Sequence, residues 1–210
     1  MYFHVTFSIK NPRICRATGR FLGFCLYTCE IGIQCGKLRN MKILGIDPGI
    51  ATVGFGVVES QKNRQRLITC GVITTPAKTA LSSRLDRIYS DLNELIDTVK
   101  PDVVAIEELF FNTNITTGIS VAHARGVMLL AVYRAGLPVY EYTPLQVKQA
   151  VVGYGRAEKN QVIDMVRRIL SLNAPPKPDD AADAVAIALC HARSSTSLLD
   201  TGGNVPCSTI

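Results

Sequence analysis

The sequence predicts an α/β protein whose mixed β-sheet is covered by helices. Short apolar runs separated by turn residues open the region that follows residue 41, and later runs alternate between helical and extended periodicity. Consecutive strands joined by short turns favour an antiparallel meander, whereas strands that alternate with helices favour parallel pairing. The expected sheet therefore contains both kinds of pairing.

The meander is predicted from three strands. The first is Ile43–Ile46, which ends at the turn sequence Asp47-Pro48-Gly49. The apolar pattern resumes at Val53–Val58, and this return predicts a hairpin. The third strand is Leu67–Thr74, and the polar residues 61–66 before it suit a second antiparallel turn.

Helices and further strands follow the meander. Six apolar residues at spacings of three and four predict one amphipathic helix that ends at Pro101: Leu85, Ile88, Leu92, Leu95, Ile96 and Val99. The apolar run Val103–Ile106 does not alternate, which is typical of a strand covered on both faces. The remaining elements are predicted as a helix over 118–134, a strand over 137–142 and helices over 157–170 and 179–192. This order is the ribonuclease-H-like arrangement.

The first forty residues are predicted to be an extension outside the fold. They hold six basic residues and one acidic residue, and so account for +5 of the net charge of +6. About +1 is left for residues 41–210, which is weak support for nucleic-acid binding by the main domain. We expect Met41 to be the natural start, 41–193 to be one domain and the Ser/Thr/Gly-rich residues 194–210 to be a flexible tail.

The sequence favours a cytoplasmic location. The apolar segment Phe21–Cys29 is too short to span a bilayer, and Glu30 follows it without a small-residue cleavage site. The cysteines lack the paired spacing of a zinc site or a disulfide framework. We therefore expect reduced thiols and no membrane contact.

Four acidic residues lie at the ends of predicted strands or on one helix face. Asp47 and Glu107 directly follow apolar strands, and Asp180 and Asp183 are three residues apart on the last helix, so they share a face. Taken singly, each has a simpler interpretation as a turn residue, a solvated strand end or a helix cap. Taken together, four carboxylates would repel one another and require a counter-ion.

Mg²⁺ fits this set of ligands, because it prefers oxygen donors and keeps several waters. Two such ions roughly 3.5–4 Å apart can activate a water and stabilise the leaving oxygen in phosphodiester hydrolysis. We expect Asp47 to bridge both ions, with Glu107 and Asp183 on one ion and Asp180 assisting the other. The individual roles stay open.

Several separated motifs resemble the RuvC family of bacterial Holliday-junction resolvases. They occur in the order and spacing of that family over residues 41–193: 46–49, 105–107, 124–126, 146–148, 151–153, 157–159 and 180–184. The resemblance implies a homodimeric, Mg²⁺-dependent enzyme that nicks two strands of like polarity in a four-way DNA junction during recombination and repair, leaving 5′-phosphate and 3′-hydroxyl ends. It also implies the RuvA–RuvB branch-migration complex as a partner.

The resemblance assigns roles to individual residues. Catalysis and metal binding fall to the four carboxylates Asp47, Glu107, Asp180 and Asp183. Lys148 and Lys159 match basic residues near the active site, where they can offset phosphate charge. Phe110 matches an aromatic residue at the junction core, and stacking on an unpaired base is worth about 1–3 kcal/mol. Without the resemblance, solvated lysines and loop packing would explain these three residues.

A two-fold dimer suits a junction that offers two equivalent strands. We predict the helix at 118–135 as the interface, because it has more apolar surface than one contact with the sheet needs: Ile119, Val127, Met128, Leu130, Ala131 and Val132. Packing inside the monomer is the alternative explanation of these residues.

Three other functions fit parts of the pattern. Asp47–Thr52 resembles the phosphate loop of the actin and sugar-kinase fold, but that fold needs a second lobe and a second nucleotide loop. A protein that only binds branched DNA would gain nothing from four like charges beside a phosphate. A related nuclease that acts on RNA or on simple duplex remains open.

Overall fold

In the computed structural model the described residues are 40–61, 64–109 and 115–200, without the side chains of 115–117 and 195–200. They belong to one compact unit, residues 37–210. Within them, the strands are β1 (Met41–Asp47), β2 (Thr52–Gln61), β3 (Arg64–Thr74), β4 (Val103–Glu107) and β5 (Val139–Tyr142). The helices are α1 (Leu81–Val99), α2 (Ile115–Arg134), α3 (Pro144–Val152), α4 (Lys159–Ile169) and α5 (Asp179–Asp200). The extension predicted for residues 1–40 lies, apart from residue 40, outside the described residues.

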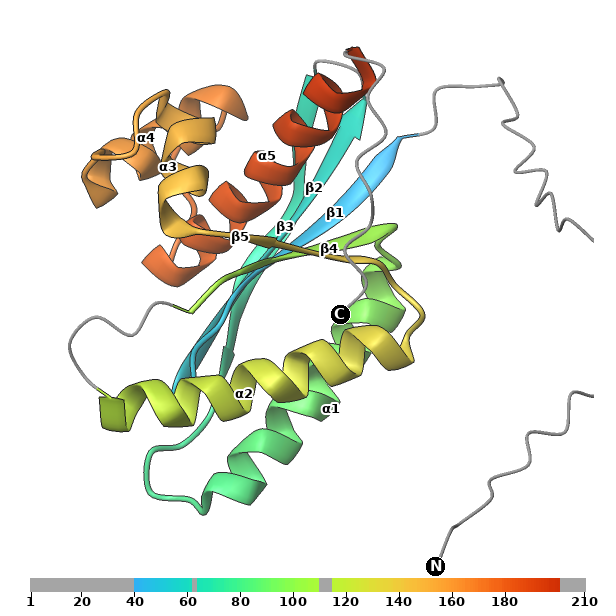
Figure 1. Ribbon diagram of the computed structural model, residues 1–210, viewed down its shortest axis with the longest axis vertical. Coiled ribbons are helices and arrows are strands. Elements are labelled where there is room, and N and C mark those ends of the chain that lie inside the picture. Colours follow the sequence, from blue (N-terminus) through green and yellow to red (C-terminus); the bar gives the residue numbers. More distant parts are fainter. Residues whose placement is uncertain (1–39, 62–63, 110–114, 201–210) are drawn as a thin grey trace, which may run out of the picture. The chain divides into compact units, whose positions relative to one another are not determined.

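The strands form one mixed sheet in the order β3-β2-β1-β4-β5. β1, β2 and β3 are antiparallel neighbours, whereas β4 is parallel to β1 and β5 is parallel to β4. Figure 1 shows α3, α4 and α5 on one face of the sheet and α1 and α2 on the other. The predicted ribonuclease-H-like sheet, a meander followed by parallel strands, is confirmed.

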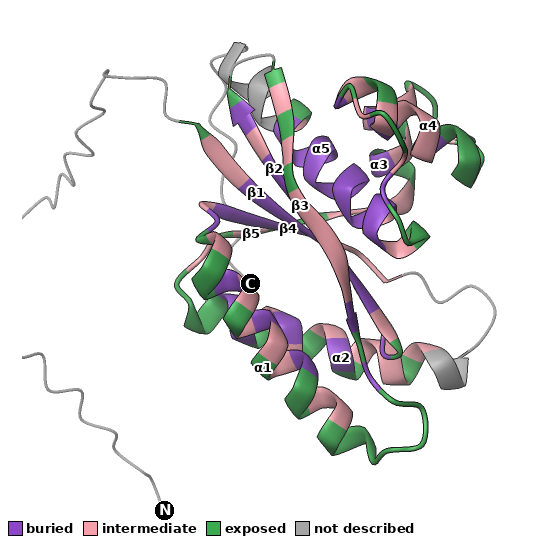
Figure 2. Cartoon of the chain, turned by 180° about the vertical axis from the view of Figure 1, so that it is seen from behind, coloured by how far each residue is buried: buried purple, intermediate pink, exposed green. Residues whose placement is uncertain are grey.

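Strand residues alternate between two hydrophobic cores. Ile43 and Val103 pack in the core on the α5 side, whereas Leu44 belongs to the core under α1 and α2. Figure 2 shows the central strands and most of the described part of α5 as buried. Successive strand side chains point to opposite faces, so Asp47 and Glu107, which follow Ile43 and Val103 by an even number of residues, point toward α5.

Glycines in β1 and β2 bring α5 into backbone contact with the sheet. Gly54 pairs with Asp47 across the two strands. A Cβ atom at Gly54 would overlap the carbonyl oxygen of Asp180, and one at Gly45 would overlap that of Ala184. Close approach of this kind requires glycine, because any side chain would push the helix outward. The first turn of α5 therefore lies over the end of β1.

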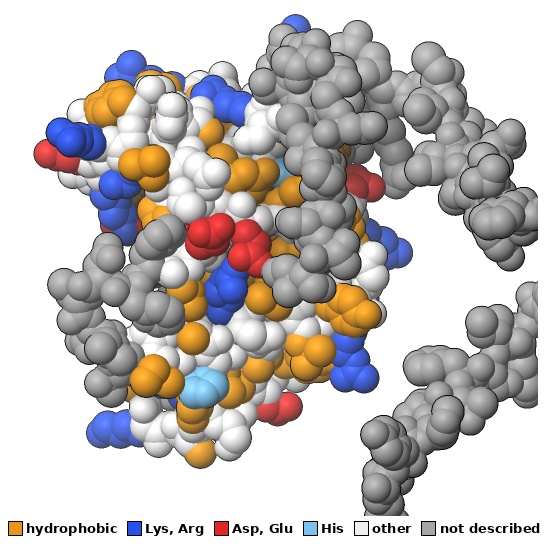
Figure 3. All heavy atoms as spheres, viewed as in Figure 1, with side chains coloured by type: hydrophobic (Ala, Val, Ile, Leu, Met, Phe, Trp, Pro, Cys, Tyr) orange, Lys and Arg blue, Asp and Glu red, His pale blue; other side chains and the backbone are white. Residues whose placement is uncertain are grey.

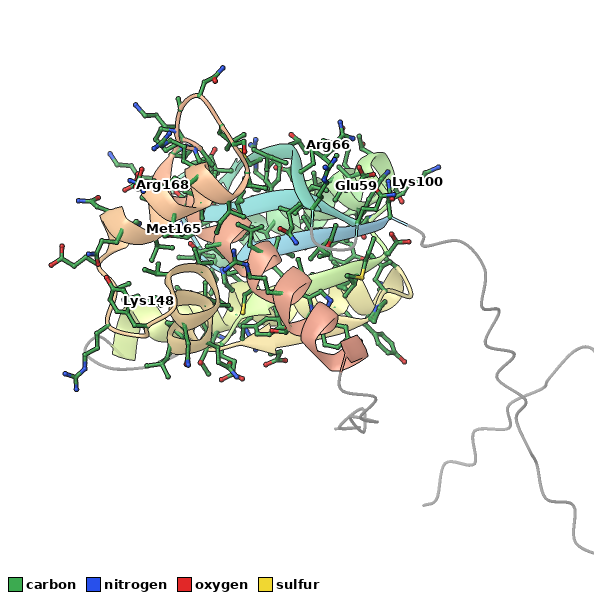
Figure 4. The ribbon with its side chains drawn as sticks, turned by 90° about the horizontal axis from the view of Figure 1, so that it is seen from above. Glu59, Arg66, Lys100, Lys148, Met165 and Arg168 are labelled. Carbon is green, nitrogen blue, oxygen red and sulfur yellow. The ribbon has the colours of Figure 1, made fainter. Side chains whose placement is uncertain are left out.

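The structure corrects several predicted boundaries. β2 and β3 extend into the predicted turn at 61–66, because polar residues can alternate along a hairpin that is solvated on one side. Glu59 and Arg66 pair across these strands at 3.2 Å (Figure 4). α5 continues past the predicted end at 192, and α1 begins before the predicted start at 85. The starts of α2 and β5 and both ends of α4 differ by a few residues.

Helix α3 was not predicted. It begins at a capping box in which the Thr143 side chain accepts from the backbone of Gln146 and the Gln146 side chain accepts from the backbone of Thr143. Pro144 occupies its first turn, and Gly153 ends it in the left-handed conformation. Helix α3 is too short for the spacing of its apolar residues to indicate a helix, although the Thr-Pro-x-Gln sequence is a helix-start signal. Among the described helices, none has both the length and the hydrophobicity to cross a membrane.

We predict that Gly54→Ala lowers the free energy of unfolding by about 1–3 kcal/mol, because the added methyl group would have to displace the backbone of α5. Denaturant unfolding followed by circular dichroism measures this change. The matched control is Gly71→Ala in β3, whose Cβ would meet only the ring of Phe55. An unfolding midpoint of Gly54→Ala equal to that of the wild type would contradict the close contact.

Candidate active site

Three carboxylates meet where β1 ends and α5 begins. Oxygen atoms of Asp47, Asp180 and Asp183 all lie within 4.8 Å of one another, and all three residues are half-buried. Asp47 is the last residue of β1, and the other two lie near the start of α5 on one helix face. The predicted meeting of acids from distant parts of the chain is therefore present in the fold. Such a group of oxygen donors could hold a divalent cation.

Glu107 lines a pocket beside these carboxylates. The pocket has a volume of about 240 Å³, and its charged lining consists of Asp47, Glu107, Asp183, Lys148 and Lys159. Its apolar lining comes from α3, α4 and α5: Pro144, Val147, Val162, Ala186 and Ile187. β4 places Glu107 here because it is parallel to β1, so both strands end at the same edge of the sheet.

The carboxyl groups of Asp47 and Glu107 are held in surroundings that oppose ionisation. Burial, together with the charges of Asp183 and Asp180, raises the pKa of Asp47 to about 7, and Lys159 acts in the opposite direction. Burial and the charges of Asp47 and Asp183 also raise the pKa of Glu107 to about 7, against the effect of Lys148. A bound cation would reverse this effect, because opposite charge favours the ionised form.

Two lysines face the carboxylates from different helices. The Nζ atom of Lys159, at the start of α4, lies 2.8 Å from Oδ2 of Asp183 and 3.8 Å from Oδ2 of Asp179. The hydrogen bond to Asp183 is the main cause of the raised pKa of Lys159. Lys148 extends from α3 (Figure 4). The unpredicted helix α3 thus carries one of the predicted phosphate contacts.

The structure brings most of the predicted residues together. Five of them line the pocket, and Asp180 belongs to the adjoining carboxylate cluster. Phe110 lies outside the described residues. His123 lies on α2 and His191 on α5, and neither joins the carboxylate cluster found among the described residues. The sequence did not predict Asp179 or the apolar lining of the pocket as parts of the site. A pattern of apolar residues on a helix indicates that they are buried, but not which pocket they line.

The donor set fits a hard cation. The cluster offers carboxylate oxygens without sulfur or imidazole ligands, which is the preference of Mg²⁺ rather than of zinc. The lysines beside it can contact an anionic substrate such as a phosphate. The pocket therefore combines ligands for a cation with positive charge for the group that the cation would act on.

We predict that Asp47→Asn stabilises the protein at neutral pH when no divalent cation is present. The folded carboxyl group keeps its proton up to about pH 7, whereas the unfolded one loses it near 3.8, so the stability of the wild type falls as the pH rises between these values. The variant lacks this loss, which is on the order of 4 kcal/mol, because one pKa unit corresponds to about 1.4 kcal/mol and the pKa of Asp47 rises from 3.8 to about 7. Denaturant unfolding in EDTA across pH 4–8 measures the difference. A difference that does not change with pH would contradict the prediction.

Comparison with known proteins shows the family of this chain. Residues 43–191 match the sequence profile of the family described as crossover junction endodeoxyribonuclease RuvC. A crossover junction endodeoxyribonuclease RuvC from Rubrobacter xylanophilus is 55% identical over 171 residues, which cover 81% of this chain and 96% of the relative. The solved structure of Thermus thermophilus RuvC is 40% identical with a TM-score of 0.69, covering 77% of this chain and 97% of that one. The same protein in complex with a Holliday junction substrate is 39% identical with a TM-score of 0.69, covering 75% and 96%. This chain belongs to the RuvC family of crossover junction endodeoxyribonucleases.

Proposed function

We propose that this protein is a structure-specific endodeoxyribonuclease that resolves Holliday junctions. In this proposal it nicks two strands of like polarity during recombination and repair. The observation that carries the proposal is one pocket in which acidic residues from β1, β4 and α5 face lysines from α3 and α4. Membership of the RuvC family, with a 39% identical structure bound to a Holliday junction substrate, supports the choice of substrate.

Mg²⁺ is the cofactor that we propose for the pocket. Its ligands would be Asp47, Glu107, Asp180 and Asp183, whose oxygens match the preference of this ion. When bound, Mg²⁺ supplies an activated water and a counter-charge for the leaving oxygen of a phosphodiester. Mn²⁺ prefers similar ligands and is the expected substitute.

The chain's own residues orient the substrate. Lys148 and Lys159 lie on the helices that wall the pocket, where each can bind a phosphate oxygen of the strand to be cut. Phosphate contacts position the DNA without reading its sequence. Phe110 remains the proposed contact to an unpaired base at the branch point. The proposal includes the cytoplasmic location that the sequence favours and the contact with the RuvA–RuvB branch-migration complex that the resemblance implies.

A second copy of the chain is the proposed partner of helix α2. Ile119, Leu130 and Tyr133 are 52%, 50% and 80% exposed, and Figure 3 shows hydrophobic side chains on the surface over this helix. Solvent-exposed apolar residues that gather on one helix face are typical of an interface. The prediction was wrong for three other residues of this helix, which pack inside the monomer: Met128, Ala131 and Val132.

We expect the protein to nick a synthetic four-way junction in Mg²⁺ and to leave linear duplex and an RNA–DNA hybrid uncut. Chelation with EDTA should abolish nicking, because the carboxylates would then lack their counter-ion. Asp47→Asn should reduce nicking to the level seen with EDTA while a gel-shift assay still detects junction binding. Equal cutting of duplex and junction would refute the resolvase proposal, and wild-type nicking by the variant would refute the assigned role of Asp47. Loss of both nicking and binding by the variant would instead indicate misfolding.

Leu130→Asp should shift the protein from dimer to monomer in analytical ultracentrifugation, because a carboxylate buried in an apolar interface has no partner there. The control is Leu81→Asp, which also places an acid at an exposed leucine, at the start of α1. This control should stay dimeric. A dimeric Leu130→Asp variant, or an equal shift in both variants, would contradict the proposed interface.

A further inference from the structure

Arg125 reaches the strand end that carries Glu107 from the face of the sheet opposite to the pocket. It lies on α2, and its Nε atom donates to the backbone carbonyl of Glu107 at 3.2 Å. Its Nη2 atom lies 2.6 Å from Oε2 of Glu141 in β5, and its side chain is only 16% exposed. In Figure 3 acidic side chains lie beside a basic one on the surface between α2 and β5.

The end of β4 needs support because β1 stops pairing with it. The parallel register ends at the pair Ile46 and Ile106. Pro48 follows β1 and has no N–H group, so it cannot donate to a continued ladder. The half-buried backbone carbonyl of Glu107 is stabilised by another hydrogen-bond donor, since a carbonyl left without a donor costs free energy. Arg125 supplies that donor to Glu107.

The same guanidinium also holds the neighbouring strand. Glu141 is in register with Ile106, and Tyr142 is in register with Glu107. A planar guanidinium can donate in two fixed directions at once, which a lysine ammonium cannot match. Arg125 therefore sets the ends of β4 and β5 relative to α2, and the backbone direction at Glu107 determines where its carboxylate points.

We propose that Arg125 is a positioning residue for Glu107. It contacts neither the substrate nor the metal; it holds the strand end from behind so that the carboxylate stays in the pocket. This inference rests on the proposed function, in which Glu107 is a metal ligand. Loss of a residue that orients a metal ligand typically costs about 10–100-fold in metal affinity or activity.

The test compares two variants that break the same ion pair. Arg125→Met removes the donor to Glu107 as well as the partner of Glu141, whereas Glu141→Gln removes only the acidic partner and leaves an acceptor for the arginine. The matched control is Arg84→Met, because the Nε atom of Arg84 donates to Thr75 at 2.8 Å on a different helix. For each variant we would measure the rise of melting temperature with Mg²⁺ concentration, junction binding in EDTA, and kcat for nicking.

Arg125→Met should require about 10–100-fold more Mg²⁺ for half of the rise in melting temperature, and its kcat should fall by a similar factor. Its junction binding in EDTA should equal that of the wild type. Glu141→Gln and Arg84→Met should stay within about threefold of the wild type, since both keep the bond to Glu107. Arg125→Lys should shift the Mg²⁺ midpoint in the same direction by a smaller factor, and it provides the test if Arg125→Met does not fold.

Three results would overturn the proposal: a wild-type Mg²⁺ midpoint in the Arg125 variants, equal losses in Glu141→Gln and Arg125→Met, or a loss of junction binding in EDTA that matches the loss of nicking. The last result would indicate direct contact with DNA. If the wild-type protein nicks no junction, the proposed function fails, but the Mg²⁺ titration still tests the role of Arg125.

Discussion

Helix α5 touches the backbone of β1 and β2, and the rest of the site depends on this contact. Gly45 and Gly54 leave room for the helix carbonyl groups, so the first turn of α5 lies over Asp47. Asp180 and Asp183 then come within a few ångströms of a residue far away in the chain. The contact also concentrates negative charge in a half-buried place, which a cation or the nearby lysines must balance.

The two faces of the sheet contribute differently to the site, and both contributions involve β4. On one face, the side chain of Glu107 enters the pocket that α3, α4 and α5 enclose. On the other face, α2 holds the backbone of the same residue through Arg125 and exposes Leu130 and Tyr133 on its outer side. One helix thus carries both the proposed dimer surface and Arg125, the proposed positioning residue for Glu107. In the proposed dimer, this arrangement would give the two sites a fixed geometry relative to a two-fold symmetric junction.

Local patterns in the sequence were enough for much of this structure. The apolar runs predicted the strands, and the position of Asp47 and Glu107 at strand ends predicted that they would meet the acids of α5. The patterns could not reveal α3, because its nine residues show little period and only the cap at Thr143 marks its start. They also misplaced Met128, because an apolar helix residue can face a core or a partner and only the packed fold decides which. Arg125 donates to the Glu107 carbonyl where Pro48 has no N–H group to offer. This arrangement depends on strand register, which no local pattern contains.

The central claim is that the fold assembles a divalent-cation site from Asp47 and the acids of α5. Anomalous diffraction from crystals soaked in Mn²⁺ tests this claim most directly. The account predicts an anomalous peak in contact with carboxylate oxygens of Asp47, Asp180 and Asp183. Crystals that show these carboxylates in place without any peak between them would contradict it.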